Sequence, residues 1–170
     1  MSKRVVVYVG GLFVAVMTIW VAFTVAMRTK FPPVQDAIRR MNRAVVNPRA
    51  METAGQPGAY ASVIRQLGRT TGTRYETPVQ ALATDDGFVI PLPYGEGADW
   101  LQNVLAEGSA VLVNEGNTYR VDDPEIVPDA VAEPYVPLKD RRSHRLYGVD
   151  QFLRVRRVEP HGTDTINEPA

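Results

Sequence analysis

One glycine- and arginine-containing turn has the residue types and spacing that best fit ligand chemistry. It reads Gly68-Arg69-Thr70-Thr71-Gly72-Thr73-Arg74. Glycine adopts positive φ at little cost, so successive backbone N–H groups can converge on one point. A guanidinium is a planar fork of donors that matches a phosphate or a carboxylate. The expected anion donors are Arg69, Arg74 and the backbone amides near Gly68, Thr71 and Gly72. Spacing alone favours the alternative, a solvated turn whose arginines have no specific partner.

Several other kinds of site find no support in the sequence. It contains no cysteine, which excludes disulfides, thiolate chemistry and cysteine-based metal sites. His144 and His161 are far apart and near no acidic cluster, so we expect no metal site. Asp85 and Asp86 lie in a hairpin turn and are more typical of turn formers than of an acid/base pair. The formal net charge of zero gives a nucleic-acid role no electrostatic support. We assign no catalytic residue.

Short strand-like runs surround this turn and must position it. Strands are expected at residues 60–67, 73–83, 88–94, 109–113, 119–121 and 150–158. Asp86-Gly87 is a hairpin signal, and Pro91 and Pro93 mark an edge or a bulge because proline donates no ladder hydrogen bond. The pattern lacks alternating strands and helices, so it predicts a compact, mostly antiparallel β-barrel with interposed helices.

A short helix is expected between Asp99, which favours a helix N-terminus, and Gly108, which is placed to end it. Trp100 belongs to its apolar face, so we expect Trp100 in the core. Asn103 is one turn further along and is expected to hydrogen-bond backbone near the site. A second short helix is expected at residues 138–146.

The N-terminal run Val5–Met27 contains no charged residue. As a helix rising about 1.5 Å per residue, it is long enough to cross a hydrocarbon core of roughly 30 Å. A buried core helix and a cleaved signal peptide are the alternatives; long soluble helices usually have a polar face, and no good cleavage site follows the run. Lys and Arg are in excess after the run, with Arg28 and Lys30 adjacent to it. The domain is therefore expected on the cytoplasmic side of the cell membrane, behind a single span.

Phe31-Pro32-Pro33 should break this helix, and residues 34–46 have helical apolar spacing with a basic opposite side. This amphipathic helix either lies at an anionic membrane surface or closes over the ligand site, or it simply packs on the barrel with its charges solvated. Asn47-Pro48 is expected to end it. The predicted division is an anchor (1–30), the amphipathic helix with its linker (31–58), the barrel domain (59–160) and a tail (161–170).

An ordered series of motifs spans the chain from about Arg39 to Val158. It comprises Arg40-Met41-Asn42-Arg43, Val46-Asn47-Pro48, Ala54-Gly55, Gly68-Arg69 with Gly72, Thr77-Pro78-Val79, Tyr94-Gly95, Asp99-Trp100 with Asn103-Val104-Leu105-Ala106, Asp123-Pro124, and Gly148-Val149 with Phe152-Leu153. In this series the chain resembles the deazaflavin-dependent oxidoreductases of the nitroreductase type, which use coenzyme F-420. Thr71 keeps a hydroxyl where that family has Ser, and Pro93 replaces a frequent Thr or Ser.

The resemblance implies a split β-barrel of the flavin- and deazaflavin-binding type, with coenzyme F-420 favoured over flavin mononucleotide. It implies that Gly68, Arg69, Thr71, Gly72 and Arg74 hold the phosphate or tail of the cofactor. It places Thr77 and Pro78 at the edge of the ring, although an ordinary strand start explains them as well. It places Tyr94 and Gly95 at the ring itself, with a rim aromatic as the alternative for Tyr94. Tyr135 and Tyr147 are expected at a substrate mouth.

The expected function is that of a membrane-anchored reductase. It would transfer hydride from a reduced deazaflavin to a lipophilic acceptor such as a quinone or a nitro compound. The alternatives are a membrane-tethered module that binds a cofactor or ligand without turnover, and a tethered interaction domain that keeps only the barrel. The oligomeric state is open, with a homodimer as one option.

Overall fold

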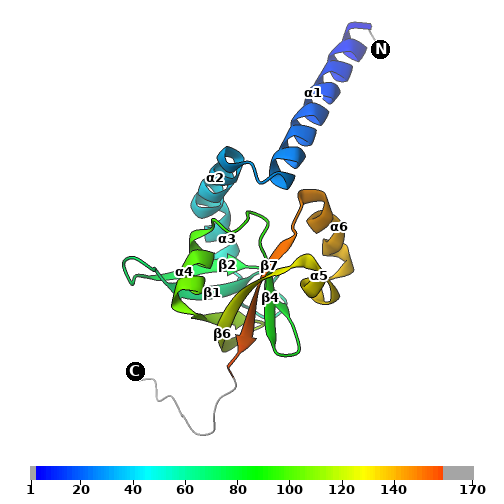
Figure 1. Cartoon of the computed structure of the whole chain (residues 1–170). Coiled ribbons are helices and arrows are strands. Elements are labelled where there is room, and N and C mark those ends of the chain that lie inside the picture. The colour runs from blue at the N-terminus through cyan, green and yellow to red at the C-terminus, as the bar shows by residue number, and fades with distance from the viewer. Residues whose placement is uncertain (1–2, 159–170) are drawn as a thin grey trace.

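A curled antiparallel sheet is the frame of the protein in the computed structural model, which describes residues 3–158 (Figure 1). Its seven strands follow the order β2-β1-β5-β6-β7-β4-β3. Their bounds are β1 Ser62–Leu67, β2 Arg74–Val79, β3 Leu82–Ala83, β4 Gly87–Pro91, β5 Ser109–Asn114, β6 Asn117–Pro128 and β7 Gln151–Arg157. All paired strands are antiparallel, which confirms the predicted mostly antiparallel β fold with helices.

The two edge strands of the sheet, β2 and β3, are consecutive in the chain and are separated only by Gln80-Ala81. So short a connection requires the sheet to curl until its edges lie close together. The prediction of one strand over residues 73–83 was therefore wrong. Two strands on opposite edges meet there at a corner, because β2 pairs with β1 whereas β3 pairs with β4.

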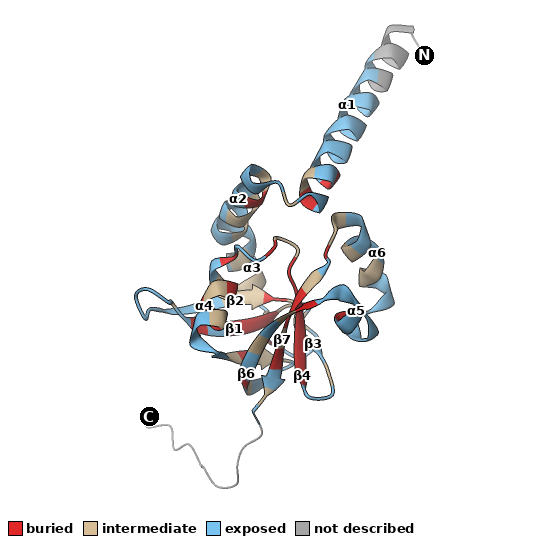
Figure 2. Ribbon diagram, in the orientation of Figure 1, coloured by how far each residue is buried: buried red, intermediate tan, exposed pale blue. Residues whose placement is uncertain are grey.

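Side chains alternate between two apolar clusters across the sheet, as the pleat of a strand requires. Phe88 and Ile90 of β4 enter the larger cluster inside the curl, and Val89 between them enters a smaller cluster on the outer face. On β7, Leu153 and Phe152 divide in the same way. Figure 2 shows the buried residues concentrated in the central strands. Helix α4 (Asp99–Glu107) packs on the larger cluster through fully buried Leu101 and Val104.

Two predictions at the ends of elements are confirmed. Gly108 ends α4 in the left-handed conformation, with φ of 75°. The chain turns between β3 and β4 at Thr84 to Gly87, where the Gly87 N–H donates to the Thr84 hydroxyl. Gly87 is required because the backbones of β4 and β7 approach closely there. A Cβ at this position would lie 2.0 Å from the carbonyl oxygen of Val155.

Strand β6 is longer than the sequence indicated. It continues to Pro128 through an irregularity between Asp122 and Glu125, where Asp123 has φ of 51°. A bulge removes Pro124 from the ladder, so its missing N–H does not end the strand. The chain then forms α5 (Asp129–Ala132), the short 3-10 helix η2 (Glu133–Tyr135) and α6 (Leu138–Tyr147), the last close to its predicted bounds.

Helix α1 (Lys3–Arg28) extends from the domain, and the predicted break at Phe31 leads into α2 (Pro32–Met41) (Figure 1). The predicted end at Asn47-Pro48 was wrong. The helix continues through a π-helical segment, η1 (Asn42–Val46), into α3 (Asn47–Met51). A π turn bonds each N–H one residue further back, and this widened turn accommodates Pro48, which has no N–H. The predicted tail at residues 161–170 lies outside the described residues.

Candidate functional site

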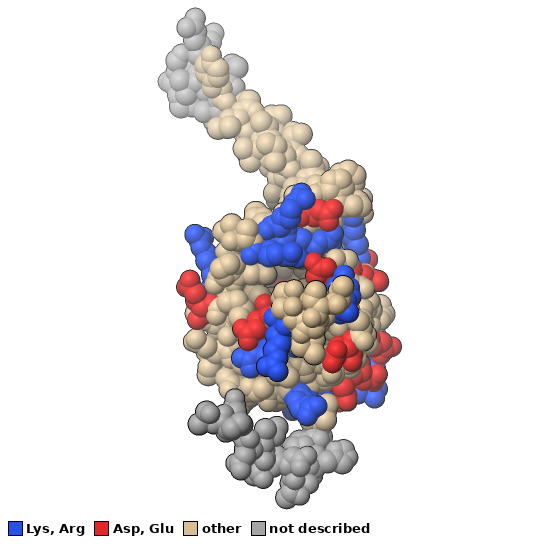
Figure 3. Space-filling view, turned by 90° about the vertical axis from the view of Figure 1, so that its left-hand side faces the viewer, with Lys and Arg blue, Asp and Glu red and all other residues tan. Residues whose placement is uncertain are grey.

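A cavity of about 470 Å³ opens between the sheet edge, α4 and the helical segment α2-η1-α3. Its volume falls in the range of ligand pockets, about 300–1,000 Å³. Figure 3 shows the hollow, with Lys and Arg side chains gathered between it and the foot of α1. The lining residues are Arg39, Asn42, Arg43, Asn47, Gln66, Gly68, Arg69, Thr70, Thr71, Tyr75, Glu76, Thr77, Pro78, Tyr94, Ala98, Asp99, Trp100 and Asn103.

The predicted anion turn forms one wall of this cavity. Gly68, Arg69 and Thr71 line it, whereas Gly72 and Arg74 do not. The Gly68 and Gly72 N–H groups already donate within the turn, to the carbonyl oxygens of Thr73 and Gly68, both at 2.7 Å. They are therefore not free for a ligand.

Two other backbone N–H groups of the turn are free to bind an anion. Among the described residues, the N–H groups of Thr70 and Thr71 have no hydrogen-bond acceptor, and both residues line the cavity. An unpaired N–H is a donor for a bound anion. The free amides of the turn are thus those of Thr70 and Thr71.

Asn103 of α4 fixes the position of Arg69. Its buried carboxamide oxygen accepts from the Arg69 backbone N–H at 3.2 Å and from the guanidinium Nη1 at 2.9 Å. The prediction that Asn103 hydrogen-bonds backbone near the site is confirmed. Trp100 packs against the core, as predicted, and also lines the cavity.

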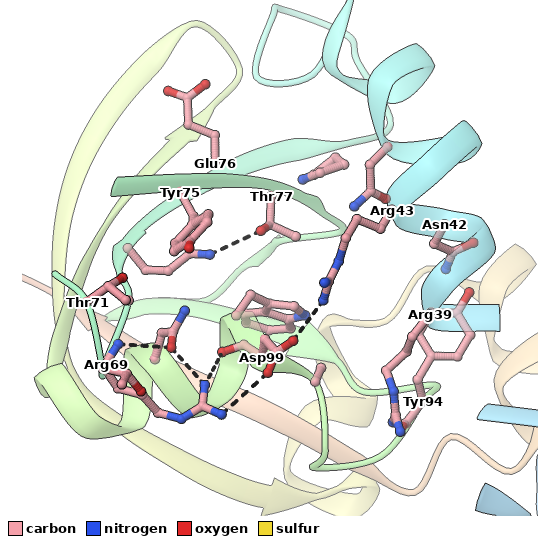
Figure 4. A pocket seen from close by; sticks show the side chains of 18 residues that line it. Arg39, Asn42, Arg43, Arg69, Thr71, Tyr75, Glu76, Thr77, Tyr94 and Asp99 are labelled. Atoms are coloured by element: carbon pink, nitrogen blue, oxygen red, sulfur yellow. Dashed lines mark hydrogen bonds and ion pairs between the residues drawn. The ribbon is translucent and has the colours of Figure 1, made fainter. Parts of the chain in front are cut away.

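Asp99, the first residue of α4, accepts from two arginines that approach from different elements (Figure 4). One carboxylate oxygen lies 2.7 Å from Arg43, and the other lies 3.4 Å from Arg69. The Arg43 hydrogen bond is the largest cause that lowers the pKa of Asp99 below its ordinary value. Burial opposes it, and the Arg69 hydrogen bond adds a smaller lowering effect. The carboxylate therefore holds two positive charges together at the cavity wall.

The basic side of the predicted amphipathic helix faces this cavity. Arg39 donates to the Tyr94 carbonyl oxygen at 3.2 Å and pairs with Asp36. Arg43 reaches Asp99, as described above. Of the three interpretations of this helix drawn from the sequence, closure over the cavity agrees with the placement of both arginines.

Sequence reasoning missed Asn42 and Asn47 as cavity residues. The π turn bonds the Asn47 N–H to the Asn42 carbonyl, so these two residues stack on one side of the helix. The polar spacing Arg39, Asn42, Arg43, Asn47 was the available signal, but the expectation that Asn47 ended the helix concealed it.

Thr77 and Pro78 line the cavity from β2. The Thr77 hydroxyl lies 3.1 Å from the Gln66 carboxamide. In the amide orientation that satisfies both of its polar atoms, Gln66 accepts from Thr77 while donating to backbone carbonyls. The Thr77 hydroxyl oxygen then keeps its lone pairs available to accept a hydrogen bond.

The remaining predicted residues divide between the cavity and other places. Tyr94 lines it, and Gly95, with φ of 66°, lies beside Lys30 and is not a lining residue. Tyr135 lines a second, open cavity of about 420 Å³. Tyr147 packs edge-on against Phe23 of α1. Neither tyrosine lines the first cavity.

In the described part of the chain, no cluster of metal-ligating residues occurs.

No protein-family description matches the chain, and no curated protein matches it. A solved structure described as an F-420 reductase is 15% identical, with a TM-score of 0.45 over 64% of this chain and 92% of that one. Another, described as an F-420-H2-dependent reductase, is 11% identical, with a TM-score of 0.44 over 55% of this chain and 92% of that one. A third, described as a domain-swapped dimer, is 11% identical, with a TM-score of 0.48 over 71% and 97% of the two chains. At these TM-scores the likeness assigns neither a family nor a cofactor to this chain.

Proposed function

We propose that the protein is a deazaflavin-dependent reductase that binds coenzyme F-420 in the cavity between α4, β2 and the α2-η1-α3 segment. One observation carries the proposal. The free N–H groups of Thr70 and Thr71 and the guanidinium of Arg69 lie in the same cavity as Thr77, Pro78 and Tyr94. An anion-binding arm and a wall for a flat ring would then be parts of one site. The sequence resemblance indicates all of these residues except Thr70, which the structure adds.

The donor set fits such a cofactor. Arg69 with the Thr70 and Thr71 amides would hold a phosphate, and the apolar face of Pro78 with the Thr77 hydroxyl would contact a heterocycle. A bound reduced deazaflavin itself supplies the hydride. The protein's part is to bind the two reactants, orient them and exclude water. No lining residue is assigned as an acid.

For the curled sheet, the specific fold proposed is the split β-barrel.

Helix α1 is proposed as a single membrane span. The window Gly11–Arg28 is apolar enough to cross a bilayer. Phe13 and Ile19 are 65% and 69% exposed, which favours a lipid environment over a protein core. A signal sequence near the N-terminus would meet the same criteria of length and composition. The span, with the basic residues that follow it, supports a cytoplasmic domain and a lipophilic acceptor such as a quinone or a nitro compound.

Equilibrium binding of coenzyme F-420 to the full chain in detergent, with flavin mononucleotide as competitor, tests the cofactor. Selective binding of coenzyme F-420 is expected. If neither compound binds, the reductase proposal is wrong and an interaction domain becomes the better explanation.

Turnover is tested separately, by steady-state oxidation of the reduced cofactor with a panel of quinones and nitroaromatics. Oxidation above the rate without protein is expected. Binding without turnover would identify the alternative, a tethered cofactor-binding module.

A further inference from the structure

The last turns of α1 are packed into the domain, although most of the helix is exposed (Figure 2). Thr24 and Met27 are only 8% and 5% exposed. The Phe23 ring meets Tyr147 of α6 edge-on at 6.4 Å, and the Arg28 guanidinium donates to the Arg145 carbonyl at 2.8 Å. The C-terminal end of α6 is therefore fixed against the end of α1.

The length of α1 places this contact at the level of lipid headgroups. A span needs about 20 apolar residues to cross the hydrocarbon core. Counted from Val5, where the uncharged run begins, such a span ends near Thr24, which is where burial by the domain begins. No linker separates the end of the span from the domain, so the end of α6 beside it would lie in the headgroup region.

Three residues at the end of α6 share one face of that helix. Arg142, Arg145 and Leu146 are spaced i, i+3 and i+4, so their side chains are neighbours. All three are exposed, and among residues 3–158 neither arginine has an ion-pair partner. The opposite side of α6 contacts the domain, where His144 meets the ring of Phe152 at 5.7 Å.

We propose that this α6 face, comprising Arg142, Arg145 and Leu146, docks on anionic lipid headgroups beside the point where α1 enters the bilayer. The proposal rests on α1 being the membrane span of the proposed function. Two free cations flanking an exposed leucine are complementary to an anionic interface, with the apolar side chain reaching below the headgroups. Arg39 and Arg43 of the other basic helix are engaged at the cavity, whereas Arg142 and Arg145 are not. Docking would hold the domain at a fixed orientation to the membrane.

The absence of cysteine from the sequence allows a clean test. Ser143→Cys in the full chain introduces the only thiol, which is labelled with a fluorescent dye. The protein is placed in nanodiscs of phosphatidylcholine, with or without phosphatidylglycerol, that contain a headgroup-attached quencher. Several-fold stronger quenching is expected with phosphatidylglycerol, and high salt should reduce it.

Arg142→Gln or Arg145→Gln should reduce the lipid-dependent quenching. Arg120→Gln, an equal change of charge, should leave it unchanged, because Arg120 lies beside Val158 at the end of β7 far from α1 (Figure 1). If the chain inserts into the discs but quenching is equal in both lipid compositions, the proposed docking of α6 is wrong, whereas the membrane span is supported. Failure to insert would overturn the span and this proposal together. Cofactor binding in detergent is measured independently of either result.

Discussion

The carboxylate of Asp99 lies 2.7 Å from the guanidinium of Arg43 and thereby joins α4 to η1 beside the cavity. The same carboxylate also pairs with Arg69. A negative side chain thus already occupies arginines that an anionic ligand would use. Asp99 is expected to set how strongly the cavity attracts anions.

Asp99→Asn should therefore tighten binding of coenzyme F-420 severalfold, since it leaves both arginines in place and removes the competing charge. Isothermal titration of the full chain measures the dissociation constant. Asp86→Asn alters an exposed carboxylate in the β3–β4 turn and is the matched control. It should leave the dissociation constant unchanged. Weaker binding in Asp99→Asn would show that Asp99 serves to position the arginines.

The lowered pKa of Asp99 also makes a prediction about pH. In an unfolded chain an aspartate titrates near about 3.9. The ion pairs thus contribute stability that is fully present above that value and is lost as the pH falls through the lower, folded pKa. Thermal unfolding between neutral and acid pH should show a smaller acid-induced loss in Asp99→Asn than in the parent chain. An identical loss in both would contradict the assignment.

Arg69→Ala should weaken cofactor binding by about 1.5–3 kcal/mol, the usual contribution of a charge-assisted hydrogen bond. Arg74→Ala removes the same charge from the other end of the turn, and Arg74 does not line the cavity. Its effect should be small. Equal losses in the two variants would indicate general attraction by positive charge, and no loss in either would reject the anion site.

Gln35 is a candidate for stabilisation. It is 2% exposed, and neither polar atom of its side chain has a hydrogen-bond partner among the described residues. Leaving a buried polar group unpaired costs about 1–3 kcal/mol, so Gln35→Met should raise the free energy of unfolding by a similar amount. Denaturant unfolding measures it. Gln102→Met is the control, because Gln102 donates to the Glu96 carbonyl and should not gain stability when replaced. A loss of stability in Gln35→Met would indicate that the carboxamide is paired in solution.

Gly87→Ala should strongly destabilise the sheet, because the added carbon would lie 2.0 Å from a backbone oxygen of β7. Overpacking against movable side chains costs about 1–3 kcal/mol. The cost here should exceed that range, because the atoms in the way belong to the backbone of a paired strand. Gly72→Ala provides the comparison. A Cβ added at Gly72 would meet no atom within 4 Å, but the backbone there has φ of +65°. The substitution should therefore cost only the strain of the left-handed conformation, about 1–2 kcal/mol. Similar thermal shifts for the two variants would contradict the close approach of β4 and β7.

The sequence by itself determined the elements whose signals are local. Asp99 and Gly108 bounded a helix, the prolines after Phe31 marked the end of another, and alternating apolar residues marked most of the strands. The turn at 68–74 was also predictable from the sequence, since turn chemistry depends on neighbouring residues. Its role in anion binding stays a prediction.

The tertiary structure decided what depends on distant partners. The corner at Gln80-Ala81 follows from the pairing of β2 and β3 with different strands, which no local pattern records. The π turn makes Pro48 compatible with a continuing helix and thereby brings Asn47 to the cavity. Asp99 acquires its two arginines only because the chain brings η1 and the turn at Arg69 to the start of α4. Charge and residue type were readable from the sequence, but their partners were set by the curl of the sheet.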